Sequence, residues 1–190
     1  MRAADLLQRQ LMTINAILHD IGDDISDEEW TRRILPETNL IAFDLWHVAR
    51  TQDWAVQTLA RGAPEVIGEP RWAGRGALAT RGIGVGRTFE QADELAHNVR
   101  RSDVLAYADA VHAVVMEWLA TLTDTDLESH PDIPAHYAAF PEYQTPAMRA
   151  ETPWAFEQPP MWRCLIGPAI GHVRDHLAEV DLLKRQMRHR

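Results

Sequence analysis

Hydrophobic residues recur every three or four positions in four long segments, a spacing typical of amphipathic helices. The segments run from about residue 3 to 21, 39 to 61 and 102 to 123, and from between residues 162 and 168 to about 187. None of them alternates polar and apolar residues as a half-buried strand does. Four amphipathic helices of about 20 residues predict an all-α fold, a four-helix bundle.

Local signals refine the ends of these helices and predict shorter ones. Ser26 to Glu29 and Thr88 to Gln91 both form capping-box patterns, which predict short extra helices. Gly62 is expected to end the second long helix, and the Gly- and Arg-rich stretch 62–87 is expected to be a loop. Residues 124–162 form a long, Pro-rich connection before the last helix. Pro168 is expected to be a first-turn proline of that helix or a kink.

Composition and charge narrow the class of protein. The 190 residues, 46% hydrophobic and 25% charged, predict one soluble domain over residues 1–190. A net charge of −9 without a cluster of Lys and Arg disfavours nucleic-acid binding. The single cysteine excludes an intrachain disulfide. We expect neither the apolar core of a secretory signal peptide nor an apolar run that approaches the length of a membrane span. A cytoplasmic protein without a membrane partner is predicted.

Three histidines carry the strongest chemical signal. His172 and His176 lie four residues apart on one face of the last helix, about 6 Å apart along its axis. His47 lies inside the apolar arc of the second helix. Each histidine alone is explained as a core residue. Together, three imidazoles facing a dry core all need hydrogen-bonding partners, and one shared divalent metal would meet that need. Three ligands would leave an open position, as catalytic sites do.

Other polar side chains are weaker candidates. Glu179, three residues after His176, is either a metal ligand, a carboxylate that orients an imidazole, or an exposed helix residue. His112 is a proton shuttle, an extra ligand or a residue at the edge of the core. Asp44 is expected to point too far round its helix to reach the site, and Cys164 to be a buried, inert thiol.

Tryptophans surround the predicted site along the sequence. Trp46 and Trp54 flank His47, and Trp154 and Trp162 precede the last helix. Core packing explains them most simply. The alternative is an apolar wall beside the open metal position, which would favour a nonpolar substrate.

Residues 26–54, 105–128 and 171–186, with His47 and the final HxxxH, resemble the DinB-like (YfiT-like) family of metal-binding four-helix bundles. The resemblance implies that His47, His172 and His176 bind the metal. It also implies zinc, with nickel or iron as alternatives, and often a homodimer. Characterised relatives include bacillithiol transferases and mycothiol-dependent maleylpyruvate isomerase. The match is weakest over residues 62–87 and 124–162, so the resemblance does not indicate a substrate.

Three functions remain open on this basis. The first is an enzyme that binds a low-molecular-weight thiol at the metal and transfers it to an electrophilic small molecule, or uses it for isomerisation. The second is a hydrolase whose nucleophile is metal-bound water. The third is a bundle that binds a metal or ligand without catalysis.

Overall fold

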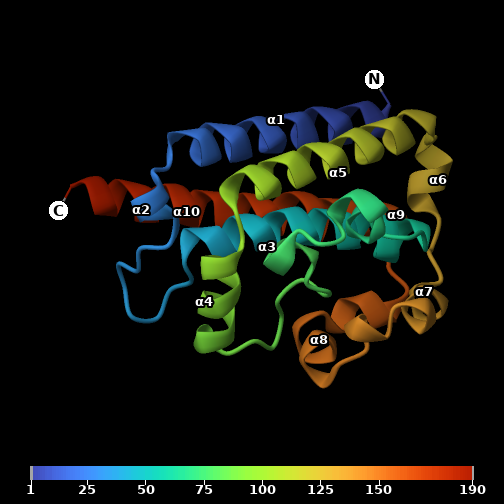
Figure 1. Cartoon of the computed structure of the whole chain (residues 1–190). Coiled ribbons are helices and arrows are strands. Elements are labelled where there is room, and N and C mark those ends of the chain that lie inside the picture. Colours follow the sequence, from blue (N-terminus) through green and yellow to red (C-terminus); the bar gives the residue numbers. More distant parts are fainter. Residues whose placement is uncertain (1, 190) are drawn as a thin grey trace.

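The computed structural model describes residues 2–189, which contain helices and turns and no strand. Its long helices are α1 (Ala3–Asp24), α3 (Ile41–Asp53), α5 (Arg101–Thr121) and α10 (Val173–Arg188). The π-helix η1 (Trp54–Arg61) extends α3. The helix α9 (Met161–Cys164) and the π-helix η7 (Leu165–His172) lead into α10. In Figure 1, α1 and α5 lie side by side, and α3 and α10 complete the bundle, each contacting the other and one helix of the first pair. The predicted all-α bundle is confirmed.

The short elements largely follow the local sequence signals. Both capping boxes are formed, and they begin α2 (Asp27–Trp30) and α4 (Phe89–Asn98). The loop 62–87 contains the 3-10 helices η2 (Val66–Gly68), η3 (Pro70–Trp72) and η4 (Gly76–Ala79). The Pro-rich connection folds into α6 (Asp124–Glu128), α7 (Ile133–Ala139), η5 (Pro141–Tyr143), α8 (Pro146–Glu151) and η6 (Pro153–Glu157). Prolines occupy the first turns of the last four of these, where a missing N–H costs no hydrogen bond.

Both helices that carry the candidate ligands contain a π-helical segment. Pro168 lies inside η7, so it is not the first-turn proline that the sequence allowed. A proline removes an N–H donor from the helix, and the wider turns of a π-helix accompany that interruption here. His172 is the last residue of η7, and α10 continues from it in regular α geometry.

Each long helix contributes to one hydrophobic core, and α3 is buried along all 13 of its residues. The helix α5 is long and apolar enough to cross a membrane by length and composition, with a mean hydropathy of 1.2. This differs from the expectation that no apolar segment would approach such a length. A third of the apolar window of α5 (33%) is buried inside the bundle, and the fully buried residues of the helix include Val104, Tyr107 and Val111.

A buried network of charged and hydroxyl groups attaches the loop 62–87 to α3. The Arg50 guanidinium, 1% exposed, donates to Asp53 (3.2 Å), Glu65 (2.6 Å) and the Tyr107 hydroxyl (2.8 Å). Its Nε donates to the carbonyl oxygen of Gly82 at 3.2 Å. Arg50 therefore holds the loop beside α3, one turn beyond His47.

Candidate metal centre

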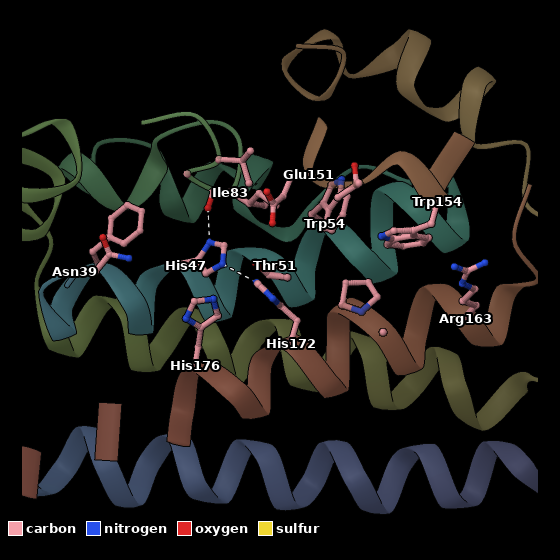
Figure 2. Close-up of a pocket in the computed structure, with 16 residues that line it drawn as sticks. Asn39, His47, Thr51, Trp54, Ile83, Glu151, Trp154, Arg163, His172 and His176 are labelled. Atoms are coloured by element: carbon pink, nitrogen blue, oxygen red, sulfur yellow. Dashed lines mark hydrogen bonds between the residues drawn. The ribbon is translucent and has the colours of Figure 1, made fainter. Parts of the chain in front are cut away.

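Helix α3 and the junction of η7 with α10 bring the three predicted histidines together. His47 is buried, His176 is half-buried and His172 is exposed, so the expectation that all three face a dry core holds for His47 alone. The ring centroids are 5.2 Å apart for His47 and His172, 4.8 Å for His47 and His176, and 4.5 Å for His172 and His176. One nitrogen from each ring lies within 4.8 Å of the other two, so the cluster could hold a metal ion. Figure 2 shows the three rings converging between the two helices.

A carbonyl from the loop 62–87 determines which nitrogen of His47 carries its proton. The Nδ1 of His47 contacts the carbonyl oxygen of Ile83, which can only accept, so Nδ1–H donates. The Nε2 lone pair then faces the Nε2 of His172 at 2.9 Å. Gly84 permits this close approach, because its φ is +98° and a Cβ there would lie 2.7 Å from the Phe43 ring.

The environment keeps the cluster uncharged. Burial, followed by the neighbouring His176, lowers the pKa of His47 to about 3. Burial also lowers the pKa of His172 and of His176. Neutral imidazoles retain a lone pair for a metal and do not repel one another.

The donor chemistry fits a divalent transition metal. Three neutral imidazoles suit zinc, nickel, iron or copper, and calcium and magnesium prefer oxygen ligands. The Ile83 carbonyl supplies the type of contact that commonly orients a metal-binding histidine through its other nitrogen. The cluster and its orienting contact therefore meet the requirements of a metal site, and they leave the choice of metal open.

Two carboxyl groups flank His176. The Glu179 carboxylate lies 3.7 Å from Nδ1 of His176, and Glu179 is otherwise exposed. Asp44 is 1% exposed, accepts from Asn39 at 3.0 Å through Oδ1, and has no partner at Oδ2. Ligand atoms of Asp44, His176 and Glu179 lie within 4.8 Å of one another. The expectation that Asp44 points away from the site was wrong, because α3 is buried on every face rather than along one stripe.

A cavity of about 470 Å³ opens beside the histidines. Its apolar wall includes Phe43, Trp54, Ile83, Val85, Trp154 and Pro168. The apolar wall predicted from the tryptophans is thus formed by Trp54 and Trp154. Trp46 packs in the core and Trp162 is partly exposed, and neither lines the cavity.

The remaining sequence candidates lie elsewhere. His112 is on α5, outside the residues that line the cavity, and burial lowers its pKa while nearby Asp109 raises it. Cys164 is buried, and burial raises the pKa of its thiol to about 11. The thiol is therefore protonated at neutral pH and inert, as predicted.

Asp44 is expected to make the metal-free protein less stable as the pH rises. Burial, opposed by Asn39, raises its pKa to about 7 in the folded protein, against an ordinary value of 3.8. The folded state favours the protonated form of Asp44. The contribution of Asp44 to the free energy of unfolding is therefore complete below about pH 4 and is lost as the pH approaches 7. Asp44→Asn stays neutral and should gain stability relative to wild type over this range, by up to about 4 kcal/mol. Urea unfolding of chelator-treated protein between pH 4.5 and 8 measures this difference. Exposed Asp20→Asn is the control, and a pH-independent difference for Asp44→Asn would contradict the assignment.

Comparison with known proteins agrees with this geometry. Residues 7–180 match the family described as the DinB superfamily. No curated protein matches the chain. The match covers α3, α5, most of α1 and the first half of α10, includes the three histidines, and confirms the resemblance seen in the sequence. The chain belongs to the DinB superfamily.

Proposed function

We propose that the protein is a metal-dependent enzyme that activates a small thiol for transfer to, or isomerisation of, an electrophilic small molecule. The observation that carries the proposal is the His47–His172–His176 cluster at the wall of an apolar cavity. A metal bound there would stabilise the thiolate form of a substrate thiol, which is the nucleophilic form. Resemblance to thiol-dependent enzymes of the family supports the choice of thiol.

The protein's own residues would have two tasks in this reaction. His47, His172 and His176 would hold the metal, with His47 fixed by the Ile83 carbonyl. Phe43, Trp54 and Trp154 would hold an apolar electrophile and exclude water from the sulfur. The chain's single thiol cannot replace the substrate thiol, because Cys164 is buried and its pKa is raised.

The proposal predicts metal-dependent consumption of thiol. Zinc-, nickel- or iron-loaded protein should accelerate the conjugation of N-acetylcysteine to 1-chloro-2,4-dinitrobenzene, measured by absorbance of the product. A chelator or His47→Ala should remove at least about 99% of the catalysed rate, because the site loses its metal or one of its three ligands.

His97→Ala provides the matched control, because His97 is exposed on α4 and contacts only the backbone of its own helix. It should retain the wild-type rate. Hydrolysis of 4-nitrophenyl acetate without any effect of thiol would favour the hydrolase instead. Stoichiometric metal without turnover of a broad panel of thiols and electrophiles would contradict the thiol proposal and leave a non-catalytic bundle. The homodimer and the cytoplasmic location stay predictions.

A further inference from the structure

A carboxylate from the Pro-rich connection points into the cavity opposite the histidines. Glu151 is the last residue of α8 and lines the cavity. Figure 2 shows its side chain over Thr51 and His172, on the side opposite the helix that carries His172. Across residues 2–189, no hydrogen bond or ion pair engages this carboxylate. Glu151 is exposed, so its carboxylate is open both to solvent and to a molecule in the cavity.

Glu151 is also the acidic residue best placed for this task. Among the described residues that line the cavity, it is the one carboxylate. Asp44 and Glu179 flank His176 and do not line the cavity. The three histidines would be occupied as ligands. Glu151 is therefore the carboxylate on the cavity wall that can serve as a base at the open face of the site.

A residue with a second unpartnered polar group lies in the wall of the same cavity. Thr51 lies one turn after His47, is 1% exposed, and lines the cavity. Its Oγ1 is buried and has no hydrogen-bond partner, although a helical threonine can bond to the carbonyl four residues earlier. A buried hydroxyl without a partner costs about 1–3 kcal/mol. Because the Oγ1 atom itself is covered, rotation of the Thr51 side chain about χ1 is needed before a substrate atom in the cavity can give this hydroxyl the partner that the chain does not supply.

We propose that Glu151 is the general base that takes the proton of the substrate thiol, and that the Thr51 hydroxyl donates a hydrogen bond to the resulting thiolate sulfur. This inference rests on the proposed function. The S–H bond breaks and its proton moves to the Glu151 carboxylate. The sulfur electron pair then forms the S–C bond to the electrophile. In a substitution, the leaving group departs with its bonding electron pair. In an addition to an activated double bond, the adjacent carbon receives the π electron pair. The proton on Glu151 then passes to that leaving group or carbon, or to water.

Thiols that differ in ionisation test the role of Glu151. N-acetylcysteine is largely protonated at neutral pH, whereas 5-thio-2-nitrobenzoate is already a thiolate and needs no base. Glu151→Gln should lower kcat/KM about 100-fold for the first thiol and less than about twofold for the second. The Glu151→Gln variant should bind as much metal as wild type. Glu157→Gln is the matched control, since Glu157 is an exposed glutamate outside the cavity lining, and it should change neither value.

Thr51→Val tests the hydroxyl with a readout besides activity. Valine has nearly the same shape and removes the unpartnered group, so the metal-free variant should unfold at a higher urea concentration than wild type. Its kcat/KM should nevertheless fall about tenfold with both thiols, because the sulfur loses a hydrogen bond. A more stable but less active variant is the signature of a group kept for the substrate rather than for the fold.

The outcomes separate the two proposals. No turnover of either thiol by metal-loaded wild type would contradict the proposed function, and this inference with it. The role of Glu151 alone would be overturned if wild type is active and the Glu151→Gln variant does one of three things: keeps the wild-type rate, loses the same fraction of the rate with both thiols, or loses its metal. Full activity in Thr51→Val would overturn the role of the hydroxyl.

Discussion

Replacing Arg50 by methionine is expected to lower the free energy of unfolding by about 3–5 kcal/mol. Methionine fills much of the volume of the side chain but leaves Asp53 and Glu65 buried without their cation. Burial, which outweighs the attraction of Arg50, already raises the pKa of Asp53 to about 6. Without the guanidinium, both carboxyl groups must take up protons or draw water into the bundle, and either change destabilises the folded state.

Urea unfolding of metal-free protein at pH 7 measures this effect. Arg32→Met is the control, because Arg32 pairs with Glu28 on the surface, where an ion pair contributes at most about 1 kcal/mol. A loss below about 1 kcal/mol for Arg50→Met would show that the network does not hold the fold. Arg50 also binds the carbonyl next to the one that orients His47, so the variant should bind metal more weakly as well.

Metal is expected to stabilise the wild-type fold and to have no such effect on His172→Ala/His176→Ala. An ion that binds the folded chain adds about 2.7 kcal/mol to the free energy of unfolding at 100 times its dissociation constant. The double variant keeps one of the three imidazoles, so its affinity should fall below the concentrations tested. Thermal unfolding with and without added zinc, nickel or iron measures the gain.

His97→Ala should show the full wild-type gain, since His97 lies on the surface of α4 away from the cluster. Equal stabilisation of wild type and the double variant would locate the binding elsewhere, for example at other surface histidines. No gain in either protein at saturating metal would contradict a metal centre.

Helical periodicity was sufficient to predict the bundle and the convergence of the three histidines. His47 and His176 lie on the regular α-helices α3 and α10, where spacing determines direction, and His172 ends η7 directly before α10 begins. The predicted direction of Asp44 was wrong because a helical-wheel projection assumes that one face of the helix is solvated, and α3 has no solvated face. Arg50 and Asp53 on the same helix are buried for the same reason, each with a partner of opposite charge.

The residues that surround the histidine cluster come from segments without the hydrophobic periodicity of a helix. Ile83, which orients His47, lies in the loop 62–87, and Glu151 and Trp154 lie in the Pro-rich connection. Their positions depend on long-range contacts, such as that of Gly84 against Phe43, which the local sequence does not encode. The glycines at 82, 84 and 86, all with positive φ, were the available signal that this loop makes a close backbone approach.

The amount of metal bound per folded chain shows whether the three histidines form a metal centre. Untagged wild type, His172→Ala/His176→Ala and His97→Ala would be reconstituted with zinc, nickel and iron in turn, desalted, and measured by inductively coupled plasma mass spectrometry. Circular dichroism would confirm that each protein is helical. We expect about one ion per chain in wild type and His97→Ala, and less than about a tenth of that in the double variant. No bound metal in folded wild type, or an unchanged metal content in the double variant, would contradict a metal centre at His47, His172 and His176.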